Sequence, residues 1–192
     1  MAITKGVNIA CSDIQASGGI KNILIRTWAE NDTISYSNTD TVHAITSIQH
    51  SGANATWFNY EFKNELPVFT ASASKENGST AYECALNFMM PEMDNAKGAA
   101  IQSLMDTCMM ALAVANNGKV YVLGISQKYS NEKATLRNQT YASMSTAEAT
   151  SGAAYNDDGG WTVNLSCKQW EAPRLYTGTV NLYTATGKST TT

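Results

Sequence analysis

Two histidines are the side chains in this sequence most able to act as a base or a metal ligand. His43 and His50 lie in a polar stretch, and no cysteine or carboxylate stands at a spacing that would make either one a base or a ligand. We therefore interpret both as surface histidines. A β-rich hydrolase that uses His43 or His50 with nearby carboxylates is the weakest of our functional hypotheses.

Glycine-containing motifs also offer little chemistry. Residues 157–160 read Asp-Asp-Gly-Gly, but their acidic positions are not spaced as in the D-x-D-x-D-G calcium loop, which favours a hairpin turn. Neither this motif nor Gly18-Gly19 is followed by a helix with Lys-Ser/Thr, as a phosphate-binding loop requires. We predict no catalytic residue, no metal site and no bound cofactor, and therefore no enzyme.

The four cysteines are dispersed and show no C-x-x-C spacing. Cys84 and Cys167 lie on the apolar faces of two predicted strands, and Cys108 lies on the apolar stripe of a predicted helix. Free cysteine is among the residues most often buried. We therefore favour free, buried thiols over a disulfide framework or a structural metal site, with Cys11 near the start of the chain left unassigned.

Composition indicates one globular domain over residues 1–192. The chain is 43% hydrophobic and only 15% charged, with a net charge of −3. That charge provides no basic surface for wrapping nucleic acid. The low charged fraction is made up by Ser, Thr, Asn, Ala and Gly, which suits a β-rich protein with polar surfaces that contact copies of itself. No apolar run resembles a signal peptide or a membrane span, so we expect a protein made in the cytosol without membrane contact.

The elements that position these residues centre on residues 91–126. Apolar residues at three- and four-residue intervals predict an amphipathic helix over residues 93–117. Asn116, Asn117 and Gly118 are typical of a helix end. The following VYVLGI, residues 120–125, is short and rich in β-formers and predicts a strand.

Two segments alternate clearly between apolar and polar residues. Residues 80–90 place Tyr82, Cys84, Leu86, Phe88 and Met90 on one face and Glu83 and Asn87 on the other. Residues 161–170 place Trp161, Val163, Leu165 and Cys167 opposite Thr162, Asn164, Ser166 and Lys168. Residues 57–72 predict a strand that pairs with 80–90 through an Asn-Gly turn within residues 75–79.

The remaining segments are less strongly patterned. Residues 20–29 and 176–183 predict strands, and residues 139–154 fit either a strand or a loop. Residues 34–56 are polar, with little to bury, and predict a long irregular or hairpin-like excursion; segments of this kind are often functional or ordered by a partner. Several short strands with one helix predict a mainly β (α+β) single domain.

The order of these parts resembles the tail tube proteins of tailed bacteriophages, which are related to type VI secretion tube proteins. The resemblance covers most of the chain and rests on four stretches: the strand pair 57–72 and 80–90, the helix running into NNGKVYVLGIS at 116–126, the segment AEATSGAAYNDDGGW at 147–161, and the closing strand 161–171 with its Glu-Ala-Pro exit. The combination carries the resemblance, since no single stretch is specific. The stretch 127–154 has no counterpart in the family pattern.

The resemblance implies two packed antiparallel sheets that form a barrel-like sandwich with one flanking helix. It further implies a virion structural protein, assembled in the host cytoplasm, whose copies form rings, by analogy six-membered, that stack into a tube for DNA. Residues 1–11 and 174–192 would be arms between subunits, and residues 34–56 an assembly loop. Sheath, baseplate and tail terminator proteins would be further partners, and DNA would pass without sequence-specific binding.

A second hypothesis from a different class stays open. Exposed tryptophan and tyrosine side chains on a β-sandwich would also suit a carbohydrate-binding or adhesin module of a virion or cell surface. Such a module is expected to be a monomer or trimer with a shallow aromatic patch, whereas a tube subunit is expected to form rings.

Overall fold

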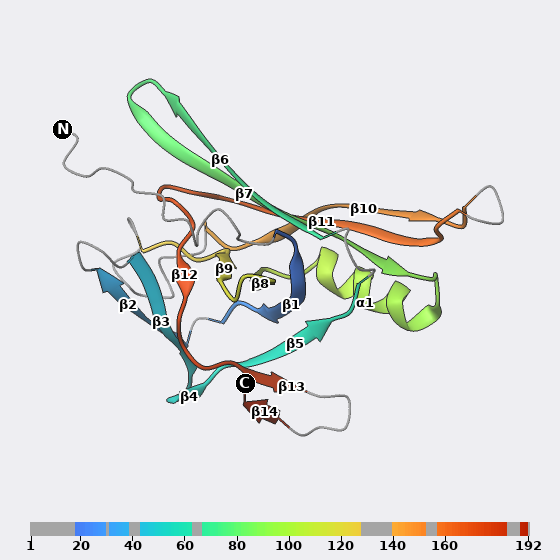
Figure 1. Ribbon diagram of the computed structural model, residues 1–192, viewed down its shortest axis with the longest axis horizontal. Coiled ribbons are helices and arrows are strands. Elements are labelled where there is room, and N and C mark those ends of the chain that lie inside the picture. Colours follow the sequence, from blue (N-terminus) through green and yellow to red (C-terminus); the bar gives the residue numbers. More distant parts are fainter. Residues whose placement is uncertain are drawn as a thin grey trace.

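A computed structural model describes residues 18–29, 31–38, 43–62, 67–127, 140–152, 157–183 and 189–191, and Figure 1 shows the chain as two β-sheets with one helix. Sheet B runs in the order β10-β11-β7-β6. Sheet A runs in the order β14-β13-β5-β1-β8-β9-β12-β3-β2, with β4 paired to β3. Among the described strands most pairings are antiparallel, and only β12–β3 and β13–β5 are parallel.

The strands of the two sheets have the following bounds. Sheet A contains β1 (Ile20–Thr27), β2 (Asp32–Asn38), β3 (His43–His50), β4 (Ala53–Asn54), β5 (Thr56–Tyr60), β8 (Met109–Ala115), β9 (Val120–Leu123), β12 (Leu175–Tyr176), β13 (Asn181–Tyr183) and β14 (Ser189–Thr191). Sheet B contains β6 (Val68–Glu76), β7 (Ser79–Pro91), β10 (Ser143–Thr150) and β11 (Gly160–Gln169). Sheet A curls into a half-barrel that packs against sheet B, which confirms the predicted mainly β sandwich with one helix.

The helix is less than half as long as predicted. Helix α1 spans Asn95–Met105, and the Asp94 carboxylate caps it by accepting a hydrogen bond from the backbone N–H of Lys97 at 2.7 Å. It buries Ile101 and Leu104 against the core. The prediction of one helix over residues 93–117 was wrong beyond residue 105, because the chain turns there and continues as strand β8.

Strand β8 lies at the centre of sheet A and is buried on both faces. Met109, Ala111 and Ala113 belong to the core between the two sheets, whereas Met110 and Leu112 belong to a second core on the other face of sheet A. A strand with two buried faces has no polar positions to alternate. The run MMALAVA therefore matches a helical stripe as well as a strand, which explains the error.

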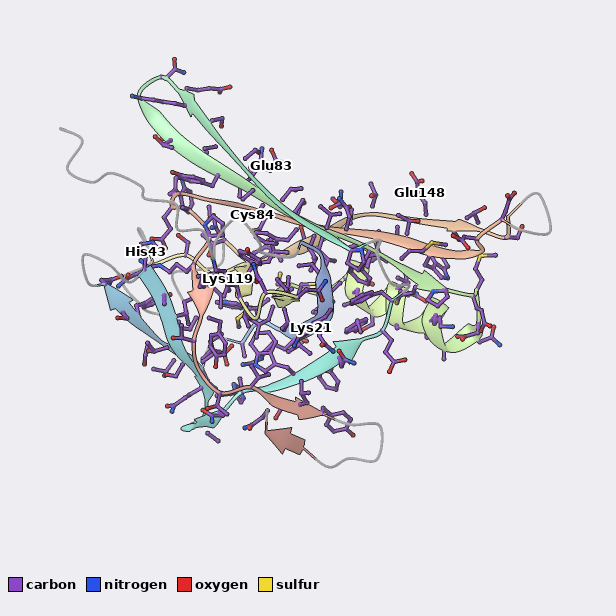
Figure 2. The ribbon with its side chains drawn as sticks, in the orientation of Figure 1. Lys21, His43, Glu83, Cys84, Lys119 and Glu148 are labelled. Atoms are coloured by element: carbon purple, nitrogen blue, oxygen red, sulfur yellow. The ribbon has the colours of Figure 1, made fainter. Side chains whose placement is uncertain are left out.

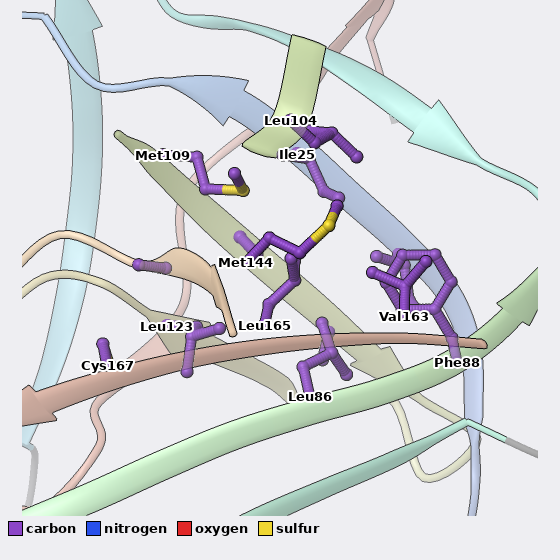
Figure 3. Packing of buried hydrophobic residues seen from close by; sticks show 14 of the residues in the cluster. Ile25, Leu86, Phe88, Leu104, Met109, Leu123, Met144, Val163, Leu165 and Cys167 are labelled. Carbon is purple, nitrogen blue, oxygen red and sulfur yellow. The ribbon is translucent and has the colours of Figure 1, made fainter. Parts of the chain in front are cut away.

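The core between the sheets brings the two alternating strands together. Cys84, Leu86 and Phe88 of β7 lie directly opposite Cys167, Leu165 and Val163 of β11. Figure 3 shows the β7 and β11 side chains meeting Met109, Met144 and Leu104 from other elements. The predictions for residues 80–90 and 161–170 are confirmed, including which face of each strand is apolar.

The second core lies inside the curl of sheet A and corrects the interpretation of residues 34–56. Strands β2 and β3 form an antiparallel hairpin in which Ile34 lies directly opposite Ile48. Ile34, Ile45 and Ile48 are all buried, in one cluster with the fully buried Trp57. The segment is hairpin-like, as predicted, but the expectation that it has little to bury was wrong.

Other predicted elements are divided differently. Residues 57–72 are not one strand, because β5 belongs to sheet A and β6 to sheet B. The predicted hairpin with residues 80–90 is therefore formed by β6 and β7, joined by Asn77 and Gly78, whose positive φ angles fit a tight hairpin turn. Residues 139–154 contain strand β10, and 176–183 contain parts of β12 and β13. The predicted arm 1–11 lies outside the described residues.

Candidate functional site

The outer face of sheet B is a regular polar surface formed by four strands. Polar residues that alternate with the core residues of β7 and β11 lie side by side on it, together with those of β6 and β10. One row across the four strands contains Val68, Asn87, Asn164 and Thr146, and the next contains Thr70, Ala85, Ser166 and Ser143. The sequence had already assigned Asn87, Asn164 and Ser166 to polar faces, but only the register aligns them in rows.

This polar face carries few charges, and most of them are acidic. Glu83 of β7 lies directly opposite Lys168 of β11, so one acidic and one basic group are adjacent. Glu148 on β10 is a further exposed acidic residue of the face. None of these charged residues belongs to the two rows named above, whose side chains carry hydroxyl, amide or apolar groups. A surface of this kind offers hydrogen bonds without a strong electrostatic field.

Both edges of sheet B are open. Strands β6 and β10 are its terminal strands, so each has one side with no strand partner within the described part of the chain. Eight of the nine β6 residues are exposed, Phe69 being the exception, and Figure 1 shows the β6–β7 hairpin extending well beyond the sandwich. The exposed part of β6, residues 70–74, contains only Thr, Ala and Ser. An open edge with an uncharged stretch of this length is a template for pairing with another chain.

A buried ionic cluster fixes the β2–β3 hairpin to the opposite end of the chain. Arg174 is 3% exposed and donates to both carboxylate oxygens of Glu171, to Asn38 of β2 at 2.6 Å and to Gln127 at 2.8 Å. Its guanidinium also lies over the Tyr36 ring. Burial alone would raise the pKa of Glu171, but hydrogen bonds from Arg174 and from the Gln127 N–H hold it below its usual value.

Each histidine lies beside a carboxylate that the sequence pattern did not reveal. His50 Nδ1 is 2.9 Å from Oδ1 of Asp32, a carboxylate that also accepts from Arg26 Nη2 at 3.0 Å. His43 Nε2 is 3.6 Å from Oε2 of Glu171. The two carboxylates come from other segments, Asp32 from the paired strand and Glu171 from beyond β11, so local spacing carries no signal for either.

In both pairs an arginine also holds the carboxylate, which indicates a structural role. Asp32 has no exposed side-chain surface and bonds a buried arginine, which fixes its position within sheet A. Burial and the nearby Arg174 charge lower the pKa of His43, although Glu171 opposes this shift, so that imidazole is neutral at pH 7. Among the described residues, no serine hydroxyl or cysteine thiol hydrogen-bonds either imidazole.

The other motifs are placed as follows. Cys84 and Cys167 are free and buried, as predicted, whereas Cys108 follows the helix and is exposed rather than buried. Asp157 and Asp158 are exposed and precede Gly160, the first residue of β11. A search of the described residues found no group of three His, Cys, Asp or Glu side chains arranged to hold a metal ion.

Comparisons with protein-family models, with curated proteins and with solved structures found no match. Within the described residues, no helix has the length and apolar character needed to cross a membrane. Assignment of a function therefore depends on the geometry of this chain, above all on the face and edges of sheet B.

Proposed function

We propose that this chain is a virion structural protein, a tail tube subunit whose copies form stacked rings around a channel for DNA. The observation that carries the proposal is sheet B, a four-stranded sheet with a polar, sparsely charged outer face and two open edges. In this proposal β6 of one copy pairs with β10 of the next. The outer faces of neighbouring sheets then join into one continuous channel wall.

The width of sheet B fits a ring of six. Strands lie about 4.8 Å apart, so four strands contribute about 19 Å and six copies a circumference of about 115 Å. That circumference corresponds to a backbone diameter of about 37 Å, and strand tilt increases it further. Subtracting about 5 Å for side chains on each side leaves a bore of about 27 Å, enough for a nucleic-acid duplex.

The composition of the proposed wall suits transit of DNA rather than binding. Lysine and arginine clusters hold phosphates through ion pairing and counterion release. In sheet B the outward Lys168 stands opposite Glu83, and most neighbouring positions are Ser, Thr, Asn or Ala. DNA would slide along such a wall without sequence-specific contacts. The subunit works by shape and assembly, with no enzymatic step.

The rest of the proposal concerns partners and location. The sheath, the baseplate and the tail terminator would contact the outside and the ends of the tube, and the subunit would assemble in the host cytoplasm before it becomes part of the virion tail. The segment 34–56 is anchored by buried isoleucines, so any ring-to-ring contact it makes uses its exposed residues rather than the whole segment.

A pair of edge variants tests the proposal. Consecutive residues of a strand direct their N–H groups to opposite sides, so Thr70→Pro and Ala71→Pro remove one donor to β7 and one donor at the open edge. The wild-type chain is expected to form rings or hollow tubes of uniform diameter in negative-stain micrographs and light scattering. The variant that loses the open-edge donor should remain folded by circular dichroism and stay monomeric. The variant that loses the donor to β7 should have a lower free energy of unfolding.

Two results would contradict the proposal. One is a wild-type chain that stays monomeric at every concentration, also when preformed tube ends are added as initiators. The other is normal ring formation by both proline variants, which would mean that β6 is not an interface.

A carbohydrate-binding or adhesin module is the second candidate, and one observation favours it. The rings of Phe58 on β5 and Tyr183 on β13 lie 5.0 Å apart, and the two residues are 47% and 44% exposed. Exposed aromatic pairs can stack on sugar rings. This candidate predicts a monomer or trimer whose binding to a glycan array is abolished by Phe58→Ala, while that variant would leave tube formation unchanged.

A further inference from the structure

The inner face of sheet B contains two free thiols in directly opposite positions. Cys84 is in the middle of β7 and Cys167 is its register partner on β11. Both are free, and their residues are 0% and 5% exposed. Directly opposite residues of antiparallel strands have Cα atoms about 4.5–5.5 Å apart, within the range of about 4.4–6.8 Å that a disulfide spans. The register therefore places the two residues at a Cα separation that a disulfide can bridge.

The two thiols also interact with one another. The neighbouring Cys167 lowers the pKa of Cys84, and Cys84 together with burial raises the pKa of Cys167, whose thiol donates to Gln169 Oε1 at 3.9 Å. This asymmetry suits a nucleophilic thiol with a second thiol that resolves its oxidised form.

A cavity lies beside this part of sheet B. The next residue in the same cross-strand row is Ala71 of β6, directly opposite Cys84. Ala71 is exposed and lines a cavity of about 570 Å³ together with Phe69, Tyr121 and Pro173. The thiol pair therefore lies one strand away from a space large enough for a peroxide, although neither sulfur belongs to the surface.

We propose that Cys84 and Cys167 form a two-cysteine redox site that a small peroxide converts into a cross-strand disulfide. The Cys84 thiolate attacks one peroxide oxygen, the O–O bond breaks, and a hydroxide leaves that is protonated to water, so that Cys84 becomes a sulfenic acid. The Cys167 thiol then attacks the Cys84 sulfur, the S–O bond breaks, and a second water leaves. The two thiols lose two electrons and two protons in total, and the peroxide is reduced to two waters.

The disulfide would join the two central strands of sheet B. It fixes the β7–β11 register near the point where the β6–β7 hairpin leaves the sandwich (Figure 2). A reducing cytosol keeps the pair as thiols, whereas an oxidising environment outside a cell permits the bond. The redox site is independent of the proposed tube function, because its chemistry needs only the folded chain.

The test uses the full chain with Cys11→Ser and Cys108→Ser, which leaves only this pair. The folded protein is treated with hydrogen peroxide, unfolded in denaturant, and titrated for free thiols. Both thiols are expected to disappear together, with an intact mass lower by two hydrogen atoms, and dithiothreitol should restore both. Cys84→Ser and Cys167→Ser in the same background are matched controls, and neither can form the bond. The first should retain its single thiol, whereas the second should lose it as Cys84 is oxidised to a sulfenic acid.

Three results would overturn the proposal: thiols that react only after the chain is unfolded, sulfinic or sulfonic acids in place of a disulfide, or disulfide-linked dimers. Peptide mapping of the peroxide-treated wild-type chain provides a test that needs no substitution. A cross-linked peptide containing Cys84 and Cys167 supports the site, and a cross-link from either cysteine to Cys108 refutes it.

Discussion

Replacing Ile48 by alanine tests whether the β2–β3 hairpin belongs to the core or is a loop that a partner must order. Ile48 is 1% exposed and packs in the cluster that contains Ile34, Ile45 and Trp57. The substitution removes three carbon groups, which corresponds to about 2.5 kcal/mol of lost transfer free energy at about 0.8 kcal/mol per group. A residual cavity adds about 1 kcal/mol, so we expect a loss of about 3–4 kcal/mol in the free energy of unfolding.

The assay is urea unfolding followed by circular dichroism and by tryptophan fluorescence, since Trp57 is fully buried beside the site. A chain of this size should lose roughly 2–4 °C in Tm for each kcal/mol, which gives a decrease of about 6–16 °C. The matched control is Thr33→Ala on the paired strand. Thr33 is exposed, so that change should stay within about 0.5 kcal/mol of the wild type.

Surface substitutions usually change the free energy of unfolding by no more than about 0.5 kcal/mol. If the free energies of unfolding of Ile48→Ala and Thr33→Ala differ by less than about that amount, the assignment of the hairpin to the core is refuted. Deletion of the whole segment separates the same alternatives more drastically. The structure predicts an unfolded product, because β3 pairs with β12 as well as with β2. A folded, soluble deletion product that fails to stack would instead restore the loop interpretation.

Three further predictions concern ion pairs and backbone. Asp32→Ala should lower the free energy of unfolding in urea by about 3–5 kcal/mol, because it leaves the buried Arg26 without its carboxylate; an effect below about 1 kcal/mol, typical of exposed pairs, would contradict this. The pKa of Glu171 is lowered in the folded state, so its contribution to stability is present above the unfolded pKa near 4.3 and is lost as pH falls below it; Glu171→Gln should remove that part of the acid dependence of the urea midpoint, and an unchanged pH profile would refute it. Gly160→Ala should destabilise by about 1–3 kcal/mol, because φ is 153° and the new Cβ would collide with the Met90 carbonyl oxygen; an unchanged Tm would show that this close approach does not exist.

Whether a strand can be predicted from the sequence depends on how many of its faces are buried. Strands β7 and β11 bury one face, so their alternation predicts both the strands and the core residues. Strand β8 buries both faces, and MMALAVA therefore continued the apparent stripe of the preceding helix. Only the position of β8 between two cores decides that it is a strand.

The prediction for the β2–β3 hairpin was wrong for a different reason, because its few buried residues are hidden among polar ones. Its isoleucines are separated by hydroxyl, charged and amide residues, and the average polarity of residues 34–56 hides them. The carboxylates beside His43 and His50 were missed because both pairs join separate segments. A pattern within one segment contains no information about a partner that tertiary folding supplies.

The sequence by itself determined the sheet-rich class, the Asn77-Gly78 hairpin turn, the existence of one helix and the inner faces of β7 and β11. Local propensity and the alternation of buried residues depend only on residues close together in the chain, so the sequence reveals them directly. The tertiary structure alone decided where the helix ends, that sheet A encloses a second core, that Cys84 faces Cys167, and that the polar rows of sheet B share one surface with open edges. Those features depend on register and strand order, which arise only when segments distant in the chain pair with one another.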